Sequence, residues 1–160
     1  MVQSQEDTTE ILFNLCKMVA SKMDSVRCNI VHYISATQGT VIASSDDKGA
    51  SGIQLDLQKY PEIISAVNMA EPVLIDDLEA DDQLANIKSL LQDISFNSMV
   101  VCPIELPDSI FGVLSLRMPH GRRRISDNEM RFITITAQIA GLLLTDRNPN
   151  KINTLTKTAC

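Results

Sequence analysis

The residues best able to do chemistry in this sequence are aspartates that follow a short apolar run. Asp76 and Asp77 come directly after Val73–Ile75, and Asp81 and Asp82 follow a few residues later. Carboxylates grouped in this way could bind a cation or accept hydrogen bonds from a ligand. Aspartate is also a common turn former and helix cap, so a solvated acidic loop is the alternative interpretation. We take Asp76 and Asp77 as candidate ligand-binding residues.

The segment before these aspartates predicts a short helix held between two prolines. Tyr60 precedes Pro61, which is tolerated in a first helical turn because its missing N–H would have no helical partner there. Pro72 ends the helix, and the apolar residues between the prolines form its buried face. The ring of Tyr60 could stack on a ligand, or it could simply anchor the start of the helix on the sheet. A helix braced in this way is expected to be the lid of a ligand pocket.

Two predicted strands alternate between apolar and more polar side chains. One face of Val26–Ile34 carries Asn29 and Tyr33, and one face of Ser109–Met118 carries Ser115. Because successive side chains of a strand point to opposite faces, these three residues could form a pocket floor. A half-exposed sheet edge is the alternative, and a shift of one residue in phase would exchange the faces. The more polar face of the first strand consists of Arg27, Asn29, Val31 and Tyr33, and that of the second strand consists of Phe111, Val113, Ser115 and Arg117.

The cysteines and histidines predict neither a metal site nor a catalytic centre. Cys16, Cys28, Cys102 and Cys160 are widely spaced, without a C-x-x-C pair, and only two histidines accompany them. Zinc sites need closely spaced ligands, and disulfide frameworks belong to small secreted proteins. No nucleophile–base–orienter set is visible, and His32, alone on its strand, is expected to be a core residue. We therefore expect reduced thiols and a cytoplasmic protein that is not an enzyme.

The charge balance argues against nucleic acid and membrane partners. Twenty acidic residues against fourteen basic ones give a net charge of -6, which repels the phosphates of nucleic acids and of anionic membranes. The three arginines Arg122–Arg124 could bind a phosphate group. In an acidic domain, however, such a run more often stays solvated or forms ion pairs with acidic side chains. No apolar run approaches the length of a membrane span, and no export signal is visible. With 160 residues, 44% of them hydrophobic, the chain suits one domain.

The remaining pattern predicts helices at both ends of the chain and strands between them. Apolar residues recur at helical spacing after Asp7 and again after Ser126, which forms a capping box with Glu129. The order predicts an α+β fold, an antiparallel sheet with the N- and C-terminal helices on one face and short lid helices on the other. The further expected elements are strands at 40–44, 73–75 and 97–106 and a second lid helix within 84–91. The expected buried stripes are Ile11, Leu12, Leu15, Met18 and Val19 on the first helix, and Phe132, Ile135, Ile139, Leu142 and Leu143 on the last.

Several short motifs follow one another in a recognisable order. They are YPEI, EPVLIDD, VCPIEL and FGVLSL, followed by ISDNEMRFITITAQIAGLLL. In this order they resemble the GAF domain family, over roughly Thr8 to Thr145. The resemblance implies a GAF/PAS-like fold, with residues 1–7 as a flexible N-terminal arm, 8–145 as the sensor domain and 146–160 as a linker or tail.

The resemblance further implies a regulatory sensor domain of a multidomain signalling protein, as in two-component systems. Such a domain binds a small-molecule ligand or a partner between its sheet and its central helices. It relays this event to an output domain of the same chain, of histidine kinase, cyclase or phosphodiesterase type. The cofactor stays unassigned, because the cyclic-nucleotide signature has no convincing counterpart and no cysteine for a covalent bilin lies between Ser44 and Val101. Haem binding would require an axial histidine ligand, and only His32 lies on a predicted strand.

Two alternatives from other classes remain open. A stand-alone GAF-fold free methionine sulfoxide reductase needs a nucleophilic and a resolving thiol, so Cys28 and Cys102 would have to lie on adjacent strands. A degenerate GAF domain would serve only dimerisation. We expect a homodimer through the terminal helices, formed by apolar residues off the main stripes, unless these residues complete the core instead. They are Phe13, Cys16, Ala20, Ile133, Ala137, Ala140 and Leu144.

Overall fold

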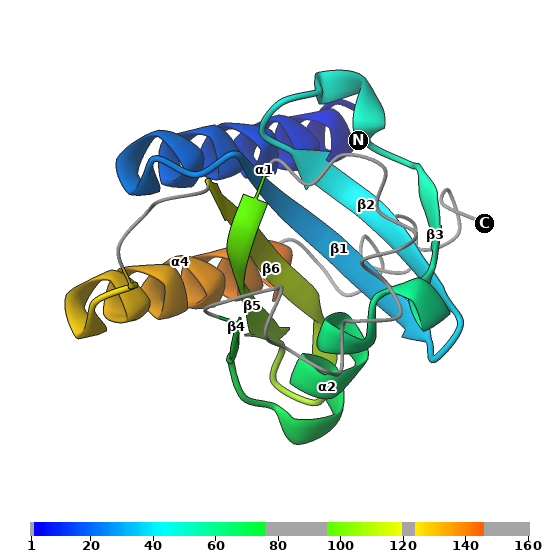
Figure 1. The fold of residues 1–160 in the computed structure, drawn as a ribbon. Helices are drawn as coiled ribbons and strands as arrows, with labels where there is room; N and C mark the ends of the chain where they lie inside the picture. Colours follow the sequence, from blue (N-terminus) through cyan, green and yellow to red (C-terminus); the bar gives the residue numbers. More distant parts are fainter. Residues whose placement is uncertain (1, 76–95, 120–123, 146–160) are drawn as a thin grey trace.

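The computed structural model describes residues 2–75, 96–119 and 124–145, which form a sheet between two layers of helix (Figure 1). All strand pairs are antiparallel, in the order β3-β2-β1-β6-β5-β4. The strands are β1 (Arg27–Ser35), β2 (Gln38–Ser44), β3 (Gln54–Asp56), β4 (Val73–Ile75), β5 (Phe96–Glu105) and β6 (Ile110–Pro119). The helices are α1 (Val2–Met23), α2 (Pro61–Met69) and α4 (Asp127–Thr145), with the 3-10 turns η1 (Lys48–Ala50) and η2 (Leu57–Lys59).

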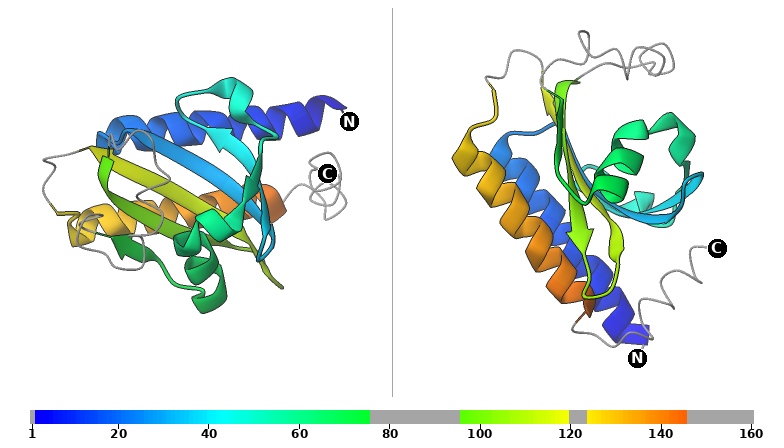
Figure 2. Two further views of the ribbon diagram at one scale, coloured as in Figure 1. Left: turned by 45° about the vertical axis from the view of Figure 1, so that its right-hand side comes forward. Right: turned by 90° about the horizontal axis from the view of Figure 1, so that it is seen from below.

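The two terminal helices cover one face of the sheet, and α2 covers the other. Figure 2 shows α1 and α4 side by side and antiparallel on one side, with α2 on the opposite side. The predicted α+β fold and its layers are therefore confirmed. The second expected lid helix lies outside the described residues.

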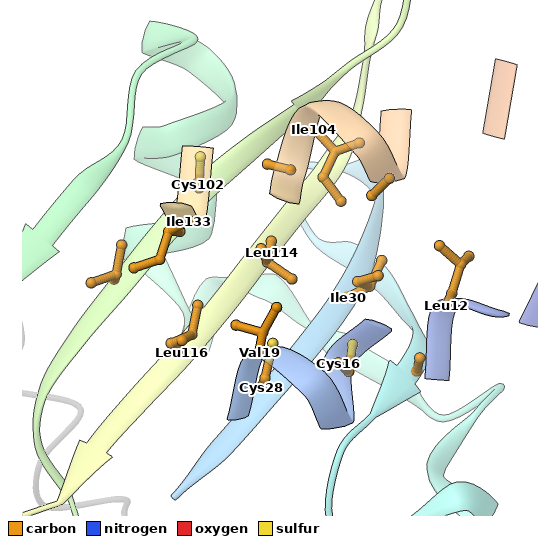
Figure 3. Close-up of a cluster of buried hydrophobic side chains, with 14 of the residues drawn as sticks. Leu12, Cys16, Val19, Cys28, Ile30, Cys102, Ile104, Leu114, Leu116 and Ile133 are labelled. Carbon is orange, nitrogen blue, oxygen red and sulfur yellow. The ribbon is translucent and has the colours of Figure 1, made fainter. Parts of the chain in front are cut away.

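The larger of two apolar cores lies between the sheet and the terminal helices. Leu12, Cys16 and Val19 of α1 meet Cys28 and Ile30 of β1 there (Figure 3). From β6 and α4 the same core receives Leu114, Leu116 and Ile133. A smaller core under α2 contains Val31, Leu57, Ile63, Ala66, Ile75, Met99, Val101 and Val113. The alternation of β1 and β6 thus supplies residues to both cores, as the period of two requires.

Helix α4 begins as predicted but presents a different face to the sheet. Its capping box is formed, since Ser126 N donates to Glu129 Oε1 at 3.0 Å and Glu129 N donates to Ser126 Oγ at 3.2 Å. The predicted buried stripe is wrong, because Ile135, Ile139 and Leu142 are 53%, 42% and 66% exposed. The residues expected off the stripe are buried in the larger core, namely Ile133, Ala137, Ala140 and Leu144.

The close approach of α4 to the end of β5 explains this orientation. A Cβ added to Gly141 would lie 2.5 Å from the carbonyl oxygen of Glu105, nearer than real Cβ atoms come. The small side chains of Gly141, Ala137 and Ala140 therefore allow the helix backbone to pack closely against the sheet. The larger side chains of Ile135, Ile139 and Leu142 on the other face would keep it further from the sheet. The small residues decide which of two apolar faces is buried.

Helix α1 differs from its prediction at its start and in part of its stripe. It begins at Val2 rather than at Asp7, because the polar residues before Asp7 are mostly good helix formers and continue the helix. Met18 is exposed and Cys16 is buried, so the buried stripe is rotated by part of a turn from the predicted one. Cys16 is thus a core residue and not a contact for a second copy, while Phe13 and Ala20 are only half-buried at the edge of the core.

A register shift near the β5–β6 turn moves Phe111 to the other face of the sheet. Ile104 pairs with Gly112 and Glu105 pairs with Ile110, which leaves Phe111 as the extra residue on β6. Phe111 therefore packs in the core beneath the terminal helices, not on the face shared with Ser115 as its alternation predicted. It stacks on His32 with ring centroids 4.3 Å apart, which confirms His32 as a buried residue.

Candidate functional site

A pocket lies between the sheet and the segment that runs from β3 into α2. Its volume is about 160 Å³. The floor comes from β1, β2 and β6, and the roof comes from Tyr60 and the first turn of α2. The lining residues are Arg27, Asn29, Val31, Val41, Ser44, Ala50, Ile53, Leu55, Tyr60, Glu62, Ile63, Ser115 and Arg117.

The register of β1 against β6 places two pairs of polar residues side by side on this floor. Arg27 is directly opposite Arg117, and Asn29 is directly opposite Ser115. Directly opposed residues in antiparallel strands have Cβ atoms about 4.5–5.5 Å apart, so the two guanidinium groups share one end of the pocket. Like charges in this position repel, and the charge of Arg27 accordingly contributes to a lowered pKa of Arg117.

Asp46, in the loop after β2, partly balances this charge. Its Oδ2 accepts a hydrogen bond from Arg27 Nε at 2.7 Å, and its Oδ1 accepts one from Ser44 Oγ at 2.7 Å. The pKa of Asp46 is lowered because the hydrogen bonds of Ser44 and Arg27 and the charge of Arg27 together outweigh its desolvation. Asp46 thus stays ionised beside Arg27 at neutral pH.

A hydroxyl of β2 links this ion pair to the amide on the floor. Ser44 Oγ also lies 2.7 Å from Asn29 Oδ1, so the single hydroxyl hydrogen can be donated to Asn29 or to Asp46 but not to both at once. The polar end of the pocket therefore contains a connected network that runs from Arg27 through Asp46 and Ser44 to Asn29.

Glu62 brings a nearly buried carboxyl group to the roof. It lies in the first turn of α2, and its residue is 8% exposed. Burial raises the pKa of Glu62 to about 7, against the opposing effects of a backbone hydrogen bond and of the Arg117 charge. The carboxyl group is therefore partly protonated at neutral pH. Burial and the charge of Arg27 lower the pKa of Arg117, while Tyr60, Glu62 and Asp46 act in the opposite sense; the guanidinium remains charged.

The structure brings three of the six predicted ligand-binding residues together. Asn29 and Ser115 lie on the pocket floor, and Tyr60 lines its edge at the start of α2. Tyr33 is not among the lining residues, because it lies further along β1, opposite Gly39, and packs against the smaller core. Asp76 and Asp77 lie outside the described residues.

Four polar lining residues were not predicted as ligand-binding, namely Arg27, Arg117, Glu62 and Ser44. The alternation had already placed Arg27 on the face of Asn29 and Arg117 on the face of Ser115, which was a usable signal. The direct pairing of the two arginines depends on the strand register, which the sequence does not reveal. Nothing in the sequence marks the burial of Glu62, because charged residues in a first helical turn are common on surfaces.

A larger hollow of about 570 Å³ lies elsewhere, between α4, the end of β5 and the connection from α2 to β4. Its wall includes Cys102, Pro103, Glu105, Thr134 and Gln138. Burial raises the pKa of Cys102 to about 11, so its thiol is protonated at neutral pH. Despite its size, this hollow contains no opposed charges among its described lining residues, and the smaller pocket under α2 is the better candidate for selective binding.

The thiol geometry does not provide the Cys28 and Cys102 pair required by the reductase alternative. Both residues pair with β6, Cys28 opposite Leu116 and Cys102 opposite Leu114, so β6 separates them. Two strand spacings amount to roughly 9–10 Å, beyond the Cα separation that a disulfide spans. Cys28 instead forms a hydrogen bond with Cys16, and this contact and burial raise its pKa well above the usual value. Among the described residues, no group of three or more histidine, cysteine or acidic side chains is placed to hold a metal ion.

Comparison with known protein families identifies the family of this chain. The GAF domain family matches residues 5–145, and the chain therefore belongs to it. No curated protein is significantly similar to the chain in sequence. Within the described ranges, no helix is long and apolar enough to cross a membrane.

Solved structures share the fold at low sequence identity. One is a methyl-accepting chemotaxis protein, residues 122 to 287, with a TM-score of 0.71, 21% identity, and 96% of each chain covered. The blue-light absorbing form of the Thermosynechococcus elongatus PixJ GAF domain gives a TM-score of 0.71 at 16% identity, covering 99% of this chain and 94% of that one. The GAF domain/HD domain protein from Geobacter sulfurreducens gives 0.70 at 13% identity, covering 98% and 99%.

Proposed function

We propose that this chain is a regulatory sensor domain that binds a small ligand under α2 and signals through its terminal helices. The observation that carries the proposal is the polar pocket between α2 and β1, β2 and β6. A pocket walled by apolar side chains with a few convergent polar groups is typical of small-molecule sites. In this proposal the domain is not an enzyme, and it acts in the cytoplasm without nucleic acid or membrane contacts.

Strands β1 and β6 offer a direct route from the pocket to the terminal helices. Asn29 and Ser115 face the pocket, while the neighbouring Ile30 and Leu114 are buried beneath α1 and α4. A ligand that shifts β1 against β6 would therefore change the packing under both helices. Closely packed interfaces respond to such shifts by switching between discrete arrangements, which a ligand can bias.

The similar structures support a role within a larger signalling protein. Their names include a methyl-accepting chemotaxis protein, a PixJ receptor and a GAF domain/HD domain protein. We propose an output domain of histidine kinase, cyclase or phosphodiesterase type in the same chain, with residues 8–145 as the sensor and 146–160 as the linker. Asp76 and Asp77, which follow β4, remain proposed ligand-binding residues.

We also propose a homodimer, through a surface that differs from the one expected. The exposed residues Ile135, Ile139 and Leu142 follow one another at i, i+4 and i+7 along α4 and so form one apolar stripe. On α1, Met18 is exposed as well. We propose that this stripe and Met18 together form a four-helix contact between two copies. A domain that served only dimerisation would use this surface and leave the pocket empty.

The ligand-binding proposal is tested with thermal unfolding of the full chain against a panel of neutral, cationic and anionic metabolites. At least one compound should raise the Tm of the wild type, because binding to the folded state stabilises it. Ser115→Leu, which places an apolar side chain on the pocket floor, should remove that rise. Ser109→Leu, at an exposed position in the β5–β6 turn, is the control and should retain it. A panel without a single stabilising compound would favour the domain that only dimerises.

A further inference from the structure

Three polar side chains of the proposed pocket keep hydrogen-bonding atoms for a ligand. Asn29 and Ser115 lie directly opposite each other on the floor, and Glu62 reaches the same pocket from the roof. Within the described ranges, Ser115 Oγ has no hydrogen-bond partner, and the Glu62 carboxyl group bonds only to its own backbone N–H. Neither group is enclosed by protein on every side. Because nearly buried polar groups without partners are costly, a ligand that bonds to them gains affinity.

The side chain of Asn29 is oriented by its neighbour on β2. Its Oδ1 accepts a hydrogen bond from Ser44 Oγ at 2.7 Å. The side-chain nitrogen lies on the other branch of the same amide carbon, and no residue of the described parts accepts from it. The Asn29 N–H and the Ser115 hydroxyl are therefore two donors on adjacent strands, with Cβ atoms about 4.5–5.5 Å apart. Two donors at this spacing can share one carbonyl oxygen, which has two lone pairs.

The charged side chains of the lining already interact with one another, which favours a neutral ligand. Arg27 donates to Asp46 at 2.7 Å. Arg117 has interactions of its own, and the charges of Tyr60, Glu62 and Asp46 act on it. A charged ligand would have to compete with one of these interactions. A carboxylate would in addition lie beside the Glu62 carboxyl group, and like charges at close range repel.

The rest of the pocket is small and largely apolar. Its volume of about 160 Å³ equals the share of roughly five water molecules in the liquid. Apolar side chains enclose the space beyond the polar groups, namely Val31, Val41, Ala50, Ile53, Leu55 and Ile63. The site therefore suits a ligand with one polar end and a short aliphatic body.

We infer that this pocket takes a small neutral aliphatic amide, whose carbonyl oxygen accepts from Asn29 and Ser115 and whose N–H donates to Glu62. The inference rests on the proposed function, since it names the ligand class of the same pocket. A primary amide or a lactam carries an acceptor and a donor side by side on one edge. The two donors of the floor match the acceptor of this edge, and the carboxyl group of the roof matches its donor.

Glu62 makes the recognition of an amide depend on pH. The ionised carboxylate accepts an N–H bond, and the pKa of about 7 means that only part of the empty domain is ionised at neutral pH. Affinity for an amide should therefore rise by up to about tenfold between about pH 6 and pH 8. The charged and titratable groups around Glu62, among the described residues of the pocket, are Arg27, Arg117, Tyr60 and Asp46. Both guanidinium groups stay charged, and Asp46 stays ionised because its pKa is lowered.

The inference is tested by ¹H–¹⁵N NMR titrations of the full 160-residue chain with three probes. Butyramide is the amide, methyl propyl ketone is a molecule of the same shape without an N–H, and butyrate is the carboxylate. We expect butyramide to shift amides of β1, β6 and the start of α2. At about pH 8 it should bind at least about tenfold more tightly than butyrate, which meets the ionised Glu62. Its advantage over the ketone should be roughly threefold to tenfold, the value of one hydrogen bond.

Matched variants locate the interaction. Asn29→Ala should weaken butyramide binding by roughly threefold to tenfold, because it removes one donor to the carbonyl oxygen. Asn68→Ala is the control, since Asn68 is exposed on α2 outside the pocket lining, and it should leave the affinity unchanged. Glu62→Gln keeps an acceptor but does not titrate, so the affinity for butyramide should no longer rise with pH. If Asn29→Ala does not fold, the pH profiles of butyramide and of the ketone on the wild type decide the question, because only butyramide should bind more tightly as the pH rises.

Several outcomes would overturn the inference. Equal affinities for butyramide and the ketone would show that the N–H is not recognised, while leaving a small-molecule sensor intact. Tighter binding of butyrate would replace the neutral ligand by an anion. An affinity for butyramide that does not rise with pH would exclude Glu62 as the acceptor. If none of the three probes shifts pocket amides, the amide inference fails, and the metabolite panel described above separately decides whether the domain binds any ligand.

Discussion

Arg27 on β1 and Arg117 on β6 face each other directly across an antiparallel strand pair, with Asp46 bound to Arg27 at 2.7 Å. Like charges in directly opposed positions destabilise a sheet. The domain therefore carries an electrostatic cost at its pocket, and such costs are common where binding sites are built. The contact between positions 27 and 117 can be changed while an ion pair between positions 27 and 46 is kept. The effect of this contact on folding can therefore be measured separately from its effect on binding.

Reversing the ion pair between positions 27 and 46 should preserve or raise the stability of the empty domain. In Arg27→Glu/Asp46→Lys the bridge persists with its charges exchanged, and the new carboxylate on β1 would face Arg117 as an attractive partner. We expect the free energy of unfolding to stay equal to that of the wild type or to rise by roughly 0.2–1 kcal/mol. Urea unfolding measures this change. The single variant Arg27→Glu is the control and should be less stable than the double variant, because two carboxylates then lie together.

Glu62 should make the stability of the domain depend on pH. Its pKa is raised in the folded state to about 7, above the ordinary value of 4.5. The stabilising contribution of the protonated form is thus complete below about pH 4.5 and is lost as the pH rises through about 7. The amount is on the order of 3 kcal/mol, from the size of the pKa change.

The variant Glu62→Gln, which stays neutral, isolates this effect. Between about pH 5 and pH 8, the wild type should lose stability relative to Glu62→Gln, and urea unfolding at several pH values measures the difference. His32, whose pKa is lowered by burial, titrates in the opposite sense in both proteins and therefore cancels. If the difference in unfolding free energy between the wild type and Glu62→Gln does not change with pH, the pKa of the Glu62 carboxyl group is not raised in the folded state.

Gly141 should resist substitution although it lies inside a helix. Replacing glycine by alanine in a helix interior normally stabilises by about 1 kcal/mol. Here the new methyl group would meet the Glu105 carbonyl oxygen at 2.5 Å, and backbone atoms must move to admit it. We expect Gly141→Ala to lower the free energy of unfolding by about 1–3 kcal/mol, as overpacked cores do.

The control for this experiment lies earlier on the same helix. Gln138 is exposed, so Gln138→Gly should follow the ordinary helix preference and cost only about 1 kcal/mol relative to Gln138→Ala. If Gly141→Ala is as stable as the wild type or more stable, α4 does not lie as close to β5 as described, and another cause must explain its buried face.

The fold was predictable because its strands and helices have clear periodicities, whereas their mutual packing was not. The five predicted strands and the helices at Pro61 and Ser126 are present within one or two residues. The buried face of α4 was not predictable, since both of its faces are apolar and the close packing of its small residues, such as Gly141 against Glu105, decides between them. Phe111 was misplaced for a similar reason, because a bulge breaks the period of two.

The candidate site shows the same division between local pattern and tertiary arrangement. Alternation along β1 and β6 correctly grouped Asn29 with Ser115 on one face. It could not show that Arg27 and Arg117 lie opposite each other, because strand register depends on which strands pair. The short strand β3 and the turns η1 and η2, which close one side of the pocket, lack the length that periodicity needs.

The apolar stripe of α4 should decide whether the domain dimerises. Ile139 lies in the middle of the stripe between Ile135 and Leu142 and is exposed in the single chain. Ile139→Glu should therefore fold normally, yet place a charge at the centre of the contact between two copies, where an unpaired charge is costly. Sedimentation velocity should show a dimer for the wild type and a monomer for this variant.

Gln138→Glu is the control for this experiment, because it adds the same charge at the neighbouring exposed position and should remain dimeric. Ala137→Glu would not serve, because Ala137 is buried in the core and a charge there would unfold the monomer itself. A wild type that sediments as a monomer at high concentration would rule out this dimer, and the stripe would then be left for an output domain of the same protein to cover.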